Sequence, residues 1–182
     1  AVVVGTLPIG IVGLAFRKVI EGPLHNLWIN AAMLAVMALA LFAAERCTKP
    51  SRPIEAVTLR DGLIVGCAQA LALIPGASRS GSTLTGAFLT GLERAAAVRF
   101  SFLLSLPAIL LSGLLELKDL NAPPDPTAPP HIPWTPVEIA VASLVAGIVG
   151  YACIAWLLRF LARHSTLFFV LYRLALAGVL AL

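Results

Sequence analysis

The residues best suited to chemistry in this chain lie together between Leu73 and Thr83. In otherwise apolar surroundings, this stretch combines small residues, hydroxyl groups and one arginine, Arg79. An arginine side chain presents a planar fork of N–H donors that matches phosphate oxygens, and a glycine-rich break frees backbone N–H groups to point at the same ligand. The stretch therefore indicates a buried anion site. The alternative is a turn between two short helices, with Arg79 reaching toward the membrane surface.

The order of residues in this stretch predicts how the site is built. Pro75 is expected to end one half-helix, and Gly76 and Gly81 permit a positive φ at the break. Ser82 or Thr83 is then expected to cap a second half-helix, whose positive end faces the anion. The spacing does not match a P-loop, because the lysine of that motif is absent. The side chains expected to bind the anion are those of Ser78, Arg79, Ser80 and Thr83.

Two further polar residues lie within apolar segments. Gln69 precedes the break by one helical stretch, so its amide is expected to reach either the anion site or a neighbouring helix. Arg173 lies midway along the last apolar run, where an unpaired charge is costly. We expect Arg173 to pair with a structural partner outside these 182 residues.

The apolar segments contain no Asp, Glu or His side chain that could cleave a phosphoanhydride. Carboxylates lie in loops or at helix ends, and His25, His131 and His164 lack the spacing of a metal site. Hydrolysis of a phosphoanhydride requires an acid or base, a metal held by oxygen ligands, or both. We therefore expect the chain to bind a diphosphate without itself supplying the groups that cleave it, and we assign no metal ligand within it.

The composition places the chain in a membrane. Hydrophobic residues make up 59% of the chain, charged residues make up 12%, and the mean hydropathy is +0.95, far from the range of soluble domains. The formal net charge of +4 is spread over the segments between apolar runs. This distribution is typical of membrane topology and not of a nucleic-acid-binding surface. We expect an all-α polytopic membrane protein that contacts membrane lipids and has no nucleic-acid partner.

The lengths of the uncharged runs predict about five transmembrane helices. A spanning helix needs roughly 20 apolar residues, and five runs reach or approach this length. They are Ala1–Phe16, Asn26–Ala44, Phe100–Leu115, Ile139–Leu158 and Ser165–Leu182, the last interrupted only by Arg173.

The two runs on either side of Arg79 are too short to cross a membrane separately. They form either one broken helix that crosses, or a re-entrant hairpin that dips to mid-depth and returns. Basic residues precede the pair between positions 46 and 60, and Arg94 and Arg99 follow it, so the positive-inside rule places both ends on the cytoplasmic side. We therefore predict a re-entrant hairpin over residues 62–92.

Residues 118–136 contain seven prolines, which exclude a continuous helix. We expect this segment to be an extended extramembrane linker on the external side. Arg17 and Lys18 also fall on the external side in this scheme, against the positive-inside rule. Residues 1–182 as a whole are expected to form a single membrane domain that is a piece of a longer protein.

The segment from Gln69 to Thr83 reads QALALIPGASRSGST and is followed by Gly91, Arg94 and FSFLLSLP at positions 100–107. This pattern resembles the second signature of the bacterial undecaprenyl pyrophosphate phosphatases, the bacitracin-resistance family. The PGxSRSGxT core is specific. The opening GTLPI at positions 5–9, the AAE at 43–45 and the terminal Tyr172-Arg173 agree as well, so the resemblance covers essentially the whole chain.

The resemblance implies an inverted-repeat architecture in which this chain is the C-terminal two-thirds and contains the second repeat. In that family each repeat contributes a re-entrant loop. The first repeat, which is absent here, carries a glutamate-rich motif and a serine-and-histidine stretch for catalysis and metal binding. A divalent cation, Mg²⁺ or Ca²⁺, is therefore expected with ligands from that missing repeat. The implied catalytic residues are Ser78, Arg79, Ser80 and Thr83, and the implied substrate-binding residues are Gln69, Gly76, Gly81 and Ser82.

The implied reaction is hydrolysis of undecaprenyl diphosphate to undecaprenyl phosphate and inorganic phosphate, which recycles the lipid carrier for cell-wall synthesis and confers bacitracin resistance. We expect the enzyme in the bacterial inner (plasma) membrane, with a polyprenyl diphosphate lipid as substrate and a homodimer as a compatible assembly. This chain alone is expected to be inactive. The alternative is a transporter or flippase of a polyprenyl phosphate or another anion, because broken helices around an anion site are also a transporter design.

Overall fold

A computed structural model describes residues 1–16, 19, 26–48, 51–119 and 135–181. Within these ranges the chain folds into α-helices and two short 3₁₀ turns, and no strand is found there. The predicted all-α class is confirmed. The α-helices are α1 (Val2–Ala15), α3 (Leu27–Cys47), α4 (Leu59–Ala70), α5 (Arg79–Leu89), α6 (Arg94–Asp119), α7 (Pro136–Arg163) and α8 (Leu167–Leu180), and the 3₁₀ turns are η1 (Ile54–Ala56) and η2 (Leu71–Leu73).

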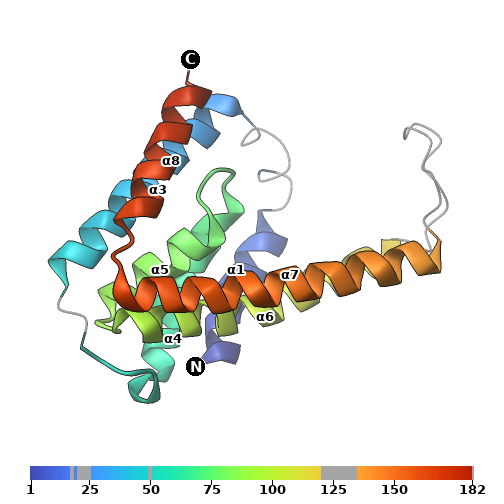
Figure 1. Cartoon of the computed structure of the whole chain (residues 1–182), viewed down its shortest axis with the longest axis horizontal. Helices are drawn as coiled ribbons and strands as arrows, with labels where there is room; N and C mark the ends of the chain where they lie inside the picture. Colours follow the sequence, from blue (N-terminus) through green and yellow to red (C-terminus); the bar gives the residue numbers. More distant parts are fainter. Residues whose placement is uncertain (17–18, 20–25, 49–50, 120–134, 182) are drawn as a thin grey trace.

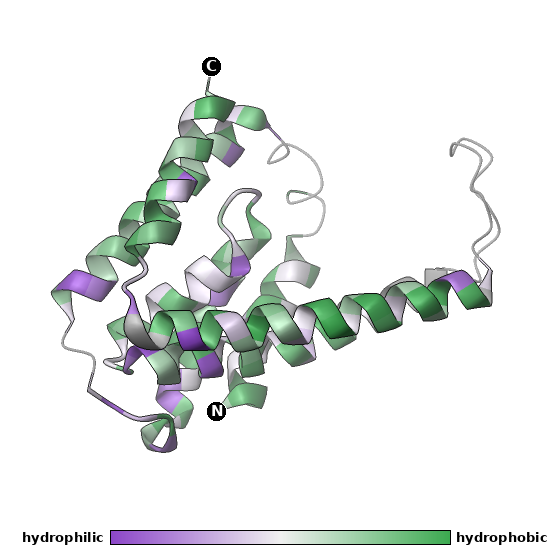
Figure 2. Ribbon diagram, viewed as in Figure 1, coloured by the Kyte–Doolittle hydropathy of each residue, from purple (hydrophilic) through white to green (hydrophobic). Residues whose placement is uncertain are grey.

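Among the described residues, three helices are long and apolar enough to cross a membrane. They are α3, α6 over Arg94–Leu111, and α7 over Val137–Leu161. Helices α1 and α8 are shorter apolar helices. Figure 2 shows hydrophobic residues along most of α7 and α8. These five helices and the α4–α5 pair confirm the predicted polytopic membrane architecture.

Helices α6 and α7 are longer than the uncharged runs that predicted them. Helix α6 begins at Arg94, because charged side chains at a helix end remain exposed and do not interrupt the backbone hydrogen bonds. Asp119 still belongs to α6, and α7 begins at Pro136, so both edges of the predicted linker are helical. A proline at the first helical position loses no hydrogen bond, and Thr135 and Glu138 form a capping box there. The rest of the predicted linker, residues 120–134, lies outside the described residues.

Helices α4 and α5 form a hairpin whose two ends meet. The backbone N–H groups of Ser51 and Arg52 donate to the Gly91 carbonyl at 3.1 and 3.0 Å, and the Glu93 N–H donates to the Arg52 carbonyl at 2.9 Å. The chain therefore enters and leaves the pair at the same level. The two helices thus form a hairpin in the structure, and its re-entry into the membrane stays a prediction.

The hairpin begins at Leu59, three residues earlier than predicted, because Thr58 and Asp61 form a capping box among charged residues. Arg52 closes its base by donating to both carboxylate oxygens of Asp61, at 3.1 and 2.7 Å, and to two backbone carbonyls. The Arg52 guanidinium, with further hydrogen bonds from Thr58, lowers the pKa of Asp61 to about 2. The base of the hairpin is thus fixed by a charge-assisted network.

Helix α1 runs alongside α4 with very close backbones. A Cβ on Gly62 would lie 2.4 Å from the Ala1 carbonyl oxygen, and one on Gly66 would lie 2.1 Å from the Gly5 carbonyl oxygen. Such contacts through small residues are typical of helix pairs in membranes. Gly13 near the end of α1 lies beside Leu73, so α1 accompanies the first limb as far as the loop.

The loop of the hairpin lies near the start of α3 and not at mid-depth as predicted. Gly76 packs against Asn30 in the first turn of α3, whereas Glu45 near the other end of α3 pairs with Arg94 at the hairpin base. Because η2 extends α4 by one 3₁₀ turn, residues 59–73 rise about 24 Å, compared with about 32 Å for α3. The hairpin therefore extends through most of the thickness that α3 spans.

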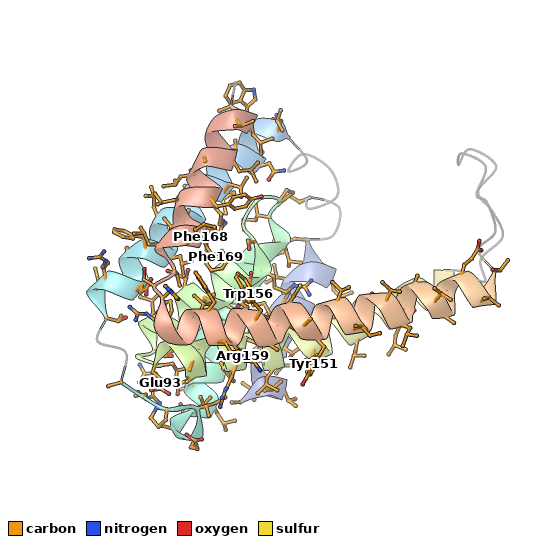
Figure 3. All side chains as sticks on the ribbon, in the orientation of Figure 1. Glu93, Tyr151, Trp156, Arg159, Phe168 and Phe169 are labelled. Carbon is orange, nitrogen blue, oxygen red and sulfur yellow. The ribbon has the colours of Figure 1, made fainter. Side chains whose placement is uncertain are left out.

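Helices α3 and α8 lie side by side, and so do α6 and α7, whose far ends project beyond the other helices (Figure 1). Helices α7 and α8 meet at an aromatic cluster in which the Phe160 ring lies 5.2 Å from Trp156 and 6.0 Å from Phe169, between centroids (Figure 3). The buried core centres on α5 and includes Phe88, with Val65 and Leu104 from the neighbouring helices. Helix α5 is thus held from several sides.

Candidate functional site

The chain turns between the two limbs of the hairpin through residues 74–78. Gly76 has a φ of 87°, and a Cβ on it would lie 2.2 Å from the Asn30 carbonyl oxygen, so both its conformation and the lack of a side chain are required. The second positive φ belongs to Ser78, at 62°, and not to Gly81 as predicted. Gly81 lies in the first turn of α5, where the helical backbone needs no positive φ.

Ser78 caps the N-terminus of α5. Its Oγ accepts a hydrogen bond from the Gly81 N–H at 3.4 Å, and the helix begins at the next residue, Arg79. The prediction that Ser82 or Thr83 caps this helix is wrong by about one turn. The helix begins directly after the strained backbone of Ser78. Ser82 and Thr83 therefore already lie within α5, where both are buried.

The N-terminus of α5 carries Arg79 and Ser80, which are both exposed. The first N–H groups of a helix have no acceptor within the helix, and the aligned peptide dipoles give this end a partial positive charge. The hydroxyls of Ser78 and Ser80 lie 3.4 Å apart at the same end. This arrangement favours an anion that carries several oxygens.

A pocket of about 430 Å³ lies between this end of α5 and α6. Three of the four predicted catalytic residues line it, and Ser78 caps the helix that carries them. The pocket has a polar part and an apolar part. The polar lining residues are Arg79, Ser80, Thr83, Ser101 and Ser105, and the apolar ones are Ala72, Phe102 and Ile109.

Sequence reasoning missed Ser101 and Ser105 as site residues. Ser101 is buried, and its hydroxyl is hydrogen-bonded to that of Thr83. Thr83 Oγ1 also lies 2.9 Å from the Arg79 carbonyl oxygen, an acceptor for its single proton, so the Ser101 hydroxyl then donates to Thr83. The two serines are four residues apart in an apolar segment and therefore share one face of α6. That spacing is the signal that could have found them.

Arg173 of α8 also reaches the loop. It is only 8% exposed, and its Nη2 donates to the carbonyls of Gly76 and Ala77 at 3.2 and 3.0 Å. Arg173 thus has hydrogen-bond partners in the hairpin loop, and a further partner outside these 182 residues stays a prediction. Its Nε and Nη1 have no hydrogen-bond partner among the described residues. Arg173 thus brings a second guanidinium with donor capacity to the site.

The approach of Arg173 explains the glycine at position 81. A Cβ on Gly81 would lie 2.2 Å from Arg173 Nη1, so only glycine lets the guanidinium reach the first turn of α5. One exposed arginine, Arg79, and one buried arginine, Arg173, thus come to the same helix N-terminus. The sequence signal for Arg173 was an isolated charge within an apolar run.

None of the four predicted substrate-binding residues lines the pocket: Gly76 and Gly81 belong to the loop and to the first turn of α5, and Ser82 and Gln69 are buried. Ser82 is buried in α5, and its Oγ donates to the Ala77 carbonyl at 3.5 Å. Gln69 is fully buried in α4, and neither its amide oxygen nor its amide nitrogen has a hydrogen-bond partner within the described ranges. The substrate-binding role of all four residues stays a prediction.

The donor groups of the pocket suit phosphate oxygens better than a divalent cation. Guanidinium and hydroxyl groups donate hydrogen bonds to anions, whereas Mg²⁺ and Ca²⁺ prefer carboxylate oxygens. Across the part of the chain that the structure describes, no group of three or more His, Cys, Asp or Glu residues could hold a metal. These residues therefore do not by themselves fit the expected cation.

Sequence comparison shows which family contains a chain with this turn and these two arginines. The profile of the bacitracin resistance protein BacA family matches residues 1–179. The chain belongs to this family. The matched residues include the hairpin loop and Arg173. The whole candidate site therefore lies within the region that matches the family profile.

Curated relatives of this BacA-family chain carry the name undecaprenyl-diphosphatase. The one from Nocardia farcinica is 48% identical over 179 residues, which cover 98% of this chain and 56% of the relative. The one from Myxococcus xanthus is 48% identical over 182 residues, or 100% and 58%, and the one from Corynebacterium diphtheriae is 45% identical over 173 residues, or 95% and 60%. The chain thus spans between 56% and 60% of the length of these relatives.

Proposed function

We propose that this chain forms the diphosphate-binding part of an enzyme that hydrolyses undecaprenyl diphosphate to undecaprenyl phosphate and inorganic phosphate. The curated relatives are named for this activity. The observation that carries the proposal is the convergence of Arg79, Arg173 and the N-terminus of α5 on one loop. A diphosphate has several negatively charged oxygens, which the exposed Arg79 guanidinium and the helix N-terminus can bind together, while Arg173 orders the loop from behind.

The residues of the loop would bind and orient the head group. Arg79 donates charge-assisted hydrogen bonds to phosphate oxygens, and the hydroxyls of Ser80 and Thr83 add neutral donors. Arg173 would fix the shape of the loop by donating from Nη2 to the carbonyls of Gly76 and Ala77. Negative charge on the equatorial oxygens of the transferred phosphoryl group is stabilised by these donors in the transition state.

The apolar side of the pocket fits the lipid part of the same substrate. Ala72, Phe102 and Ile109 line the pocket beside its polar residues, so the first isoprene units would lie against them while the head group meets Arg79. The rest of the tail would lie among membrane lipids around the apolar helices. Such an enzyme in the bacterial inner membrane would recycle the lipid carrier of cell-wall synthesis and confer bacitracin resistance.

The groups that complete catalysis are proposed to lie outside these 182 residues. The pocket lining contains no carboxylate and no histidine. An acid or base and the carboxylate ligands of a divalent cation, Mg²⁺ or Ca²⁺, would therefore come from the remaining length that the relatives possess. The role of this chain is to hold the substrate in position for them.

The site is proposed to face the external side of the membrane. The loop lies level with Asn30 in the first turn of α3, whereas basic residues such as Arg46, Arg52 and Arg60 lie at the other end, near the hairpin base. Since an excess of basic residues marks the cytoplasmic side, the loop lies toward the opposite surface.

Phosphate release by the complete protein that carries this chain tests the function. The protein in detergent should release inorganic phosphate from undecaprenyl diphosphate, and EDTA should lower the rate at least about tenfold if a cation is required. No release by the wild-type protein with Mg²⁺ or Ca²⁺ present would contradict hydrolysis. Movement of the intact lipid between leaflets of proteoliposomes, without release, would favour the transporter alternative.

A further inference from the structure

Glu45 joins three helices at the cytoplasmic end of the molecule. It is 9% exposed near the end of α3, and its Oε1 accepts a hydrogen bond from Arg94 Nε of α6 at 2.6 Å. Its Oε2 accepts two more, from the backbone N–H of Thr166 at 3.0 Å and from the Thr166 hydroxyl. A buried carboxylate with these three donors fixes the relative positions of α3, α6 and the start of α8.

The carboxylate of Glu45 replaces a cap within α8. Thr166 occupies the N-cap position of α8, but its side chain makes no capping hydrogen bond to the N–H groups of the helix. Both donors of Thr166 instead point to Glu45. A negative charge at a helix N-terminus is also favourable to the helix dipole. Helices α3 and α8 lie side by side (Figure 1). Glu45 therefore sets the position of α8 along its axis relative to α3.

Arg173 lies on the same face of α8 as Thr166. The two residues are seven positions apart, which is two turns and about 10 Å along the helix. Val170 and Ala177 are buried on this face as well, with the periodicity of a helix side that packs inward. A displacement of Thr166 along the helix axis is thus transmitted directly to Arg173.

The contacts of Arg173 leave little tolerance for such a displacement. Its Nη2 lies 3.0 Å from the Ala77 carbonyl oxygen, an ordinary hydrogen-bond distance, and 3.2 Å from that of Gly76, at the upper end of the range. Its Nη1 lies against Gly81, where even a methyl group would not fit. A shift of about 1.5 Å, one residue of helix rise, would break this arrangement.

We propose that Glu45 is a positioning residue of the diphosphate site, which holds α8 through Thr166 at the height where Arg173 reaches the loop. The inference rests on the proposed function of the loop as a diphosphate site. Glu45 lies at the hairpin base, at the other end of α3 from the loop, and it touches no substrate. Its effect must pass through Arg173.

Binding of inorganic pyrophosphate to the complete protein in detergent, measured by titration calorimetry, tests this role. Glu45→Gln should raise the Kd about tenfold, and Thr166→Val, which keeps the Arg94 pair and the Thr166 N–H bond, about threefold. Thr166→Ser retains the hydroxyl and should stay within about twofold of wild type. The matched control is Glu93→Gln, an exposed carboxylate at the hairpin base (Figure 3), which should also leave binding unchanged.

A double-mutant cycle separates positioning from a general loss of stability. In an Arg173→Ala background, Glu45→Gln should change the Kd by less than about twofold, because the residue it positions is gone. A further tenfold weakening in that background, or normal binding by Glu45→Gln, would overturn the inference. A wild-type protein that binds pyrophosphate with this pattern of variants but releases no phosphate would refute hydrolysis and leave the positioning role standing. Absence of pyrophosphate binding by the wild type would overturn both.

Discussion

At the scale of single residues, the site depends on two arginines in different environments. Arg79 is exposed at the start of α5 and lines the pocket, whereas Arg173 is buried and its Nη2 is bonded to two loop carbonyls. The exposed arginine can follow the substrate, and the buried one keeps a fixed geometry. The first two predictions concern these residues.

Arg79→Ala in the complete protein should lower phosphate release at least about a hundredfold, because a charge-assisted clamp in a low-dielectric site is worth several kcal/mol in the transition state. Arg79→Lys should also be poor, since a point charge does not reproduce the planar fork. Activity of Arg79→Ala within threefold of wild type, in protein that elutes as a single peak, would refute the role.

Gly81→Ala should reduce pyrophosphate binding and phosphate release at least about tenfold. The new Cβ would lie 2.2 Å from Arg173 Nη1, so the guanidinium must leave the first turn of α5. The control is Gly178→Ala on α8, where a Cβ would meet nothing within 4 Å. Equal activities of the two variants would show that the close approach of Arg173 is not needed.

At the scale of secondary-structure elements, the hairpin of α4 and α5 positions the loop. Its base is closed by Arg52 and Asp61, and its limbs are packed against α1 and the core. Two predictions address its base and its orientation.

The Arg52–Asp61 contact should make stability depend on pH. The pKa of Asp61 is lowered to about 2 in the folded protein, so the contact stabilises the fold fully above the ordinary pKa of an aspartate, near 4, and this is lost as the pH falls toward 2. Asp61→Asn should therefore have a lower Tm than wild type at pH 7, by an amount that corresponds to roughly 1–2 kcal/mol. The two Tm values should converge between about pH 4 and pH 2 in detergent. A constant difference over that range would show that the charge of Asp61 does not contribute to stability.

The hairpin should place its base and its loop on opposite sides of the membrane. Single cysteines at Ser51 and Glu93, both exposed at the base, should react with an impermeant maleimide only from the cytoplasmic side. A cysteine at Ser80 in the loop should react from the external side. The background must lack Cys47, Cys67 and Cys153, which are all exposed. Reaction of Ser51 and Glu93 from different sides would refute the hairpin.

At the scale of the whole molecule, we expect this chain to bind a diphosphate without cleaving it. The proposed anion-binding groups at Ser78–Thr83 lie within these residues, whereas the pocket lining has no carboxylate or histidine that could move a proton or hold a metal. The purified 182-residue chain should therefore bind pyrophosphate weakly and release no phosphate, with or without Mg²⁺ or Ca²⁺.

The complete protein assayed in the same buffer is the control for this experiment. Co-expression of the chain with the additional segment that its relatives possess should restore turnover, because separately inserted membrane helices can assemble. Metal-dependent turnover by the chain alone would mean that its catalytic groups lie within it, and Glu93, exposed beside the base of the hairpin, would be the first residue to test.

The sequence by itself predicted the membrane class, the hairpin and a loop suited to an anion. These properties follow from local features. Long apolar runs indicate a lipid environment, a pair of short runs flanked by basic residues favours a hairpin, and hydroxyls beside an arginine and two glycines suit an anion. Motif resemblance then indicated the family that the comparison confirmed.

Tertiary structure decided which distant residues join the loop and how far it reaches. Arg173 and Gly76 are 97 positions apart, and Ser101 meets Thr83 across two helices, so neither contact has a local signature. The cap at Ser78 was missed because a positive φ at a serine arises from packing around Gly76 and not from propensity. The level of the loop beside Asn30 depends on how α1, α3 and α4 pack, and packing between helices is a property of the assembled fold.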